Sequence, residues 1–286
     1  MSDTQTILPQ AIGIGLRSPH FQQVLEQHPD ADWLEIHSEN FFNPASAQRL
    51  ILDQIAPQYP LSFHGIGLSL GSTDPLNSDH LKQLKALVDC YSPALISEHL
   101  SWSSVSGQYF NDLLPIPYTS ESLLHFSDRV KQVQDYLGRN LLIENPTAYL
   151  SFDHSEFTEA EFLAELQHRS GCDLLLDLNN IYVNSINLGM NLSNYLETIP
   201  VAAVKEIHLA GFTRQQLDSG EILIDTHGSR VSDPVWSLFC AYRQRCQAPA
   251  LIEWDTDIPA LSVLMEEADK AREYQQMSSD WQRVSA

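Results

Sequence analysis

The sequence predicts an α/β protein built as a single (β/α)8 barrel, the TIM barrel. Short apolar runs alternate along the chain with segments of helical periodicity, and this alternation is typical of a parallel sheet covered by helices. Eight such units are the number that closes a barrel. The chain has 286 residues, of which 43% are hydrophobic, and barrels of this kind often use about 250 residues as one domain.

The expected strands are runs of apolar and β-branched residues that stop at Gly, Pro or a polar side chain. They cover residues 11–17, 32–40, 61–64, 94–99, 141–145, 173–177, 204–209 and 250–254. The expected helices cover residues 19–27, 45–55, 78–89, 121–137, 158–168, 191–196, 234–245 and 262–276. Because no linker or low-complexity tract interrupts this order, we expect one domain over 1–286 with flexible tails at 1–10 and 277–286.

Local signals support several element boundaries. Gly138 is placed to end the helix before it, and Thr158 with Glu161 has the spacing of a capping box. Residues 101–118 are expected to form a long loop, which is usually a functional or covering element, and residues 222–228 a loop or small hairpin.

Composition restricts the partners and the compartment. The net charge is −21, from 16 basic and 37 acidic residues, which disfavours nucleic acid and anionic membranes as partners. The four cysteines form no CxxC pair, so we expect reduced thiols. The first residues lack the pattern of a signal peptide, and no apolar run approaches about 18 residues. We therefore expect a cytoplasmic protein.

Polar side chains stand where the predicted strands end. They are Glu39, His64, His99, Glu144, Asp177, Asn180, His208 and Glu253, and the segment after the seventh strand adds Asp225 and His227. In a barrel these strand ends face one mouth. A divalent ion needs three or four such ligands, so ten candidates predict two or three ions with bridging carboxylates. Mixed imidazole and carboxylate ligands suit Fe, Mn or Zn.

Structural interpretations of the same residues remain open. A histidine at one strand end is often structural, and His37 fits a core or supporting position better than a ligand position. The carboxylates could pair with Arg17 or Lys205. The other histidines fall on helices or loops and are expected at the surface: His20, His28, His80, His125, His154 and His168. Gly13-Ile14-Gly15 is not a dinucleotide fingerprint, because no third glycine follows at the required spacing.

Ten short motifs occur in order along residues 11 to 265. They are Gly-Leu-Arg (15–17), Glu-Ile-His-Ser-Glu-Asn (35–40), Phe-His-Gly-Ile-Gly-Leu-Ser (63–69), Ser-Glu-His-Leu-Ser-Trp (97–102), Asp-Leu-Leu-Pro (112–115), Ile-Glu-Asn-Pro (143–146), Leu-Leu-Asp-Leu-Asn-Asn (175–180), Glu-Ile-His-Leu-Ala-Gly (206–211), Asp-Thr-His-Gly (225–228) and Ile-Glu-Trp-Asp (252–255). This ordered set resembles the multinuclear non-heme iron-dependent oxidative enzymes (MNIO), the family that includes the methanobactin-biosynthesis iron oxygenase.

The resemblance implies a function and a set of ligands. It implies two or three non-heme irons and the O2-dependent oxidation of cysteine in a ribosomally synthesised precursor peptide, giving an oxazolone and thioamide, a thiooxazole or a related product. It also implies a small partner protein that binds the peptide leader. By motif, the metal ligands would be His64, His99, Glu144, Asp177, Asn180, His208, Asp225, His227 and Glu253, with Glu144, His208 and Asp225 as catalytic residues. Asp177 and Asn180 share one motif, and one of the two is expected to reach an iron.

Two other classes of function fit the same ligand set. A divalent-metal isomerase or endonuclease on a related barrel would use Zn or Mn as a Lewis acid. A metal store or scaffold without catalysis is the second alternative.

Overall fold

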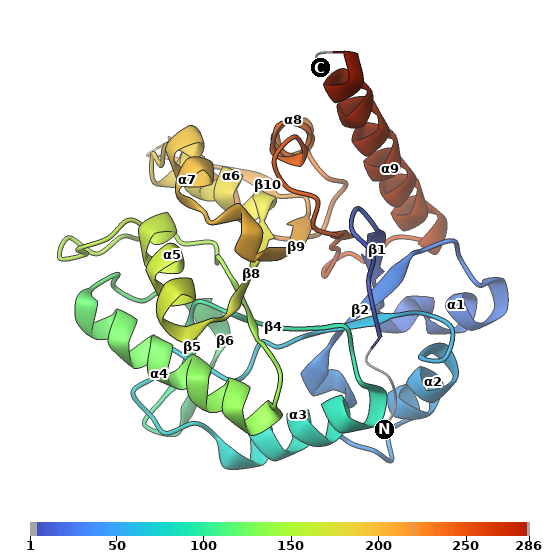
Figure 1. The fold of residues 1–286 in the computed structure, drawn as a ribbon, viewed down its shortest axis with the longest axis horizontal. Helices are drawn as coiled ribbons and strands as arrows, with labels where there is room; N and C mark the ends of the chain where they lie inside the picture. The colour runs from blue at the N-terminus through green and yellow to red at the C-terminus, as the bar shows by residue number, and fades with distance from the viewer. Residues whose placement is uncertain (1–4, 219, 285–286) are drawn as a thin grey trace.

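The computed structural model describes residues 5–218 and 220–284, and within them eight parallel strands close into a barrel (Figure 1). The barrel strands are β1 (Ile12–Gly15), β2 (Trp33–His37), β3 (Leu61–His64), β4 (Leu95–His99), β7 (Leu142–Glu144), β8 (Asp173–Asp177), β9 (Val204–Leu209) and β12 (Ala250–Ile252). Each strand pairs with the next one in this order, and β12 returns to β1. The predicted fold class is confirmed.

Helices surround the barrel (Figure 1). They are α1 (Phe21–Gln27), α2 (Ala47–Ile55), α3 (Ser78–Tyr91), α4 (Ser120–Leu137), α5 (Glu159–Ser170), α6 (Leu178–Asn187), α7 (Leu192–Thr198), α8 (Asp233–Arg243) and α9 (Leu261–Val284), with short 3-10 turns η1 (Ser18–His20), η2 (Ser38–Phe41) and η3 (Val201–Ala203). In α4, Phe126, Val130 and Val133 recur every three or four residues and are buried, as the apolar stripe of a covering helix should be. Within the described residues, none of these helices combines the length and apolarity needed to cross a membrane.

Several helix boundaries follow the local signals. Gly138 adopts the left-handed conformation after α4, with φ of 68°, and this conformation is easy for glycine. The capping box of α5 is complete, because Thr158 accepts a hydrogen bond from the Glu161 backbone and Glu161 accepts one from the Thr158 backbone. Both signals are confirmed.

Other expectations need correction. Residues 101–118 are not a simple loop, because β5 (Trp102–Val105) and β6 (Gln108–Leu114) form a hairpin there. The small hairpin considered near 222–228 exists but begins earlier, with β10 (Thr213–Leu217) pairing with β11 (Gly220–Ile224). Helix α6 follows β8 directly and was not predicted, because its asparagines are weak helix formers.

The chain termini and three histidines also differ from expectation. Helix α9 continues to Val284, eight residues past the predicted end at 276, while residues 1–4 and 285–286 of the predicted tails lie outside the described residues. His20, expected at the surface, is buried, and its Nε2 lies 2.8 Å from the Pro259 carbonyl oxygen. His80 is half-buried beside Glu39, and His125 is half-buried with its Nε2 2.7 Å from the Ser72 carbonyl oxygen.

The glycines of Gly13-Ile14-Gly15 have a steric role at β1. A Cβ on Gly13 would lie 2.4 Å from the Trp33 indole, which is fully buried with Ala11 and Leu251. A Cβ on Gly15 would lie 2.9 Å from the Arg17 guanidinium carbon. Both positions therefore need glycine so that a large side chain can pack against the strand.

Replacing Gly13 by alanine should destabilise the fold without touching the polar mouth of the barrel. The added methyl group has no space beside Trp33, and overpacking of this kind costs about 1–3 kcal/mol. Urea unfolding of Gly13→Ala measures the loss. Adding Trp33→Leu should recover part of it, and a Gly13→Ala protein as stable as the wild type would contradict the steric explanation.

Candidate metal centre

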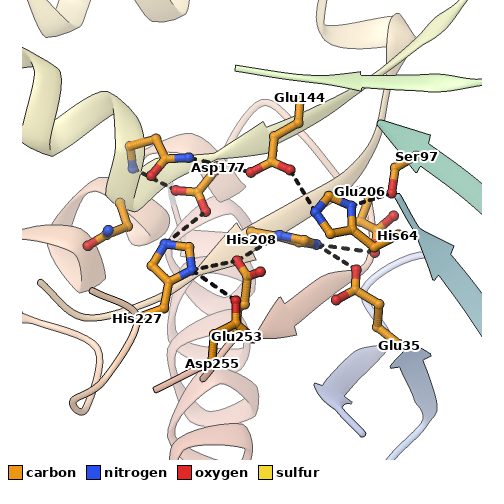
Figure 2. Close-up of polar contacts among 12 residues, drawn as sticks. Glu35, His64, Ser97, Glu144, Asp177, Glu206, His208, His227, Glu253 and Asp255 are labelled. Atoms are coloured by element: carbon orange, nitrogen blue, oxygen red, sulfur yellow. Dashed lines mark hydrogen bonds and ion pairs between the residues drawn. The ribbon is translucent and has the colours of Figure 1, made fainter. Parts of the chain in front are cut away.

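The strand ends bring the predicted polar residues together at one mouth of the barrel (Figure 2). All nine sequence-predicted ligands belong to one connected set of ion pairs and hydrogen bonds. Neighbouring strands supply neighbouring members, because parallel strands end on the same side.

The first part of the set comes from β3, β4 and β7. Glu144 Oε2 lies 3.3 Å from His64 Nε2 and 3.2 Å from His99 Nε2. The remaining ring nitrogens have other partners: His64 Nδ1 lies 2.7 Å from Ser97 Oγ, and His99 Nδ1 lies 3.1 Å from the Gly65 carbonyl oxygen. These three side chains are all buried.

The tautomer of His99 requires a proton or a cation between its ring and Glu144. A carbonyl oxygen can only accept, so His99 Nδ1 carries the proton and donates it to Gly65. Burial lowers the pKa of His99 to about 4, so the ring is neutral and its Nε2 carries a lone pair. That lone pair faces a carboxylate oxygen of Glu144 at 3.2 Å. At this distance two hydrogen-bond acceptors repel each other unless a proton or a metal ion lies between them.

The second part of the set comes from β8, β9, the segment after β11 and the residue after β12. Glu253 Oε2 lies 3.0 Å from His208 Nδ1 and 3.2 Å from His227 Nδ1. His227 Nε2 lies 2.7 Å from Asp225 Oδ1 and 4.0 Å from Asp177 Oδ2. Glu144, Asp177, His208 and Glu253 each offer one ligand atom, and these four atoms lie within 4.8 Å of one another. Glu144 therefore belongs to both parts.

Amide side chains set the orientation of the carboxylates. Asn145 and Asp177 exchange two hydrogen bonds, from Asn145 Nδ2 to the Asp177 carbonyl and from the Asp177 N–H to Asn145 Oδ1. Asn180 directs its Nδ2 at Glu144 Oε1 and receives a hydrogen bond from Thr147 on its Oδ1. In this orientation Asn180 turns its amide nitrogen toward Glu144, whereas Asp177 Oδ2 accepts no hydrogen bond from the described residues and lies 4.0 Å from His227 Nε2. Of the two, we expect Asp177 to reach a metal ion.

The centre holds more carboxylates than the positively charged groups around it can neutralise. Burial, together with nearby carboxylates such as Glu253, raises the pKa of Asp177 to about 7 and that of Glu144 well above its usual range. Glu253 differs: the imidazoles of His227 and His208 outweigh its burial and hold its pKa well below the usual range. A bound cation would allow the remaining acids to ionise.

The alternative that the predicted ligands are salt-bridge partners of Arg17 or Lys205 does not hold. Arg17 Nη2 pairs with Asp255 Oδ1 at 2.6 Å and lies 3.6 Å from Glu35 Oε1. Lys205 is exposed and donates to the Ala202 carbonyl. Asp255 in turn lies 3.6 Å from His227, so Arg17 supports the edge of the centre.

Sequence reasoning missed two buried acids beneath the centre, Glu35 on β2 and Glu206 on β9. Glu35 Oε2 and Glu206 Oε1 lie 3.1 and 3.5 Å from His208 Nε2 (Figure 2). A signal for Glu206 exists in the sequence, because it precedes His208 by two residues and side chains two apart in a strand share a face. Ser97, the partner of His64, was also missed.

A separate pair of acids braces the loop between His64 and His99. Glu39 Oε1 accepts hydrogen bonds from the N–H groups of Ile66 and Gly67, and Glu98 accepts from those of Leu68 and His99. Burial and the charge of Glu39 raise the pKa of Glu98 to about 8. A Cβ on Gly67 would lie 2.8 Å from the His80 ring, so the loop needs glycine to lie this close.

The residues present fit a metal ion. Across the described part of the chain, two buried carboxylate oxygens of the centre, Glu144 Oε2 and Asp177 Oδ2, accept no hydrogen bond. Buried polar atoms left in this way are costly unless a ligand satisfies them. Carboxylate oxygens and imidazole nitrogens are ligands for Fe, Mn and Zn.

Solved structures similar to this chain share its fold. An L-ribulose 3-epimerase matches with a TM-score of 0.63 and 14% identity, over 97% of this chain and 98% of that chain. A xylose isomerase-like TIM barrel protein from Mycobacterium smegmatis, solved in complex with magnesium, matches with a TM-score of 0.57 and 12% identity, over 96% and 99%. At this identity the likeness establishes the barrel and nothing further.

Sequence relatives are much closer. The chain is 54% identical over 261 residues to the UPF0276 protein VP3015 of Vibrio parahaemolyticus, covering 91% of each chain. It is 50% identical over 267 residues to the UPF0276 protein AM1_3026 of Acaryochloris marina, covering 93% of this chain and 95% of that one. Residues 11–276 match the family model described as RiPP precursor modification enzyme MbnB/TglH/ChrH, where RiPP denotes a ribosomally synthesised and modified peptide. The protein therefore belongs to the MbnB/TglH/ChrH family of RiPP precursor modification enzymes.

Proposed function

We propose that this protein is an iron- and O2-dependent oxidase that modifies cysteine in a ribosomally synthesised precursor peptide. The observation that carries the proposal is the unprotonated Nε2 of His99 facing Glu144 Oε2 at 3.2 Å, inside a buried set of further carboxylates. This arrangement would suit more than one divalent ion, because Glu144 belongs to two groups of candidate ligands. Membership of a peptide-modifying family supports the peptide as substrate.

The ligands divide into groups that share Glu144. His64, His99 and Glu144 would hold one iron, and Glu144, Asp177, His208 and Glu253 a second. Asp225 and His227 stand 2.7 Å apart beside Asp177 and Glu253, where a third ion would bind. When bound, the irons would supply the redox chemistry with O2 and bind the cysteine thiolate.

The chain itself would orient the peptide and handle protons. Asp225 and His227 are the more exposed members, with side chains 17% and 12% exposed, whereas His208 is fully buried. Asp225 is held by Asn179 Nδ2, and its backbone N–H donates to the hydroxyl of Tyr149 at the protein surface. Asp225 is therefore the predicted catalytic residue best placed to take the proton of an arriving thiol.

The remaining expectations form part of the same proposal. A small leader-binding protein would present the peptide, and the reaction would take place in the cytoplasm. The alternative of a divalent-metal isomerase or endonuclease has the barrel in its favour, but fold alone does not decide between reactions.

Iron content and O2 consumption test the proposal directly. Protein purified anaerobically with Fe(II) should hold two or three irons per chain, and it should consume O2 when given a cysteine-containing precursor peptide from its own genome. A Cys→Ser version of that peptide is the matched control and should cause no uptake. Fewer than two irons together with no O2 uptake would rule the function out.

Substituting Glu144 should remove metal before it harms the fold. Gln has the shape of the protonated acid, so the metal-free Glu144→Gln protein should melt close to the metal-free wild type. Loss of the shared ligand should weaken iron binding at least as much as loss of a supporting residue, about 10- to 100-fold. Calorimetry and iron analysis measure the two quantities, and a Glu144→Gln or Glu144→Ala protein that unfolds yet keeps its iron would contradict this role.

A further inference from the structure

Two carboxylates lie below the candidate metal centre, inside the barrel. Glu35 comes from β2 and Glu206 from β9, and both are fully buried. Their oxygens converge on one atom, His208 Nε2, at 3.1 Å from Glu35 Oε2 and 3.5 Å from Glu206 Oε1. These strands are not neighbours, since β1 and β12 lie between them in the ring. The convergence is therefore a feature of the closed barrel.

The other contacts of the two acids do not account for their burial. Glu206 Oε2 accepts a hydrogen bond of 3.2 Å from Ser62 Oγ, and Glu35 Oε1 lies 3.6 Å from Arg17 Nη2. Both oxygens of Glu35 and Oε1 of Glu206 have no hydrogen-bond partner in the residues that the structure describes. Unpaired carboxylate oxygens in a barrel core are costly. His208 is the group that both carboxylates approach, through Oε2 of Glu35 and Oε1 of Glu206.

The two nitrogens of His208 face different surroundings. Nε2 points down to Glu35 and Glu206, while Nδ1 points toward Glu253, one of the four residues whose ligand atoms gather at the centre (Figure 2). In this structure Nδ1 is hydrogen-bonded to Glu253 Oε2 at 3.0 Å. A cation between Nδ1 and Glu253 would take the place of the proton in that hydrogen bond, and the two acceptors beside Nε2 would then keep the remaining proton of the ring on that nitrogen. A histidine that holds its Nε2 proton can bind a cation through Nδ1, because the neutral ring has one proton and one lone pair.

We propose that Glu35 and Glu206 are positioning residues that hold the Nε2–H of His208 and so present its Nδ1 lone pair to the metal centre. The inference rests on the proposed function to the extent that a metal binds among Glu144, Asp177, His208 and Glu253. Carboxylates behind a metal-bound histidine fix its tautomer and ring orientation and make the ligand more basic. Here two acids share the task, so removing one leaves the other in place.

Metal titration of matched variants tests this role, with Co(II) as the probe because its visible bands report coordination. The variants are Glu35→Gln, Glu206→Gln, the double substitution, and Glu159→Gln as the control. Glu159 is also a buried acid, but its partners are the hydroxyls of Tyr118 and Tyr195. The double variant should bind one class of Co(II) about 10- to 100-fold more weakly and with altered bands. Each single variant should lose less, and the class bound by His64, His99 and Glu144 should keep its affinity.

The outcomes separate this inference from the proposed function. If the wild type binds no Co(II), the proposed function fails and this inference fails with it. If the wild type binds and the double variant titrates identically, the positioning role alone is wrong. If replacing a buried Glu by Gln only destabilises the protein, the Glu159→Gln control should also melt at a lower temperature. Its Co(II) bands should then remain those of the wild type. Should the double variant not fold, the two single variants still decide the question, and unchanged affinity and bands in both would overturn the inference.

Discussion

The burial of several carboxylates in one small space is the constraint on which the rest of the structure depends. Glu35, Glu144, Asp177, Glu206 and Glu253 are all nearly or fully buried at the mouth and interior of the barrel. A buried charge costs several kcal/mol after relaxation unless it is paired. Arg17 is the buried cation beside this set, and it already pairs with Asp255. The histidines and any bound cations must supply the remaining compensation.

The loops at the mouth serve the same requirement. His64 and His99 reach Glu144 because the glycine-containing loop after β3 turns closely over Glu39 and Glu98, whose carboxylates accept its backbone N–H groups. The same loop supplies the Gly65 carbonyl that fixes the His99 tautomer. Glu39 and Glu98 therefore orient ligands without facing the centre themselves. Sites of this kind commonly form on loops that a rigid scaffold holds in place.

The barrel and most of the site could be predicted from the sequence, because both depend on local patterns. Apolar runs that end in His, Asp or Glu mark the strands and the residues at their ends, and β3, β8 and β9 begin and end where predicted. The β5–β6 hairpin was missed because β6 is mostly exposed and has no apolar alternation. Glu35 and Glu206 could not be assigned to His208, because that contact arises only when strands distant in the ring face each other across the closed barrel.

The end of β7 shows how the fold keeps like charges together. Pro146 has no N–H and ends the strand after Glu144, so the main-chain ladder between β7 and β8 cannot continue. The Asn145 side chain takes over, exchanging two hydrogen bonds with the backbone of Asp177. Neutral hydrogen bonds thus hold Glu144 and Asp177 on adjacent strand ends, where their charges would otherwise drive them apart. Because this geometry is fixed by uncharged groups, the carboxylates are already in place before a cation binds, and the binding energy need not be spent on assembling them.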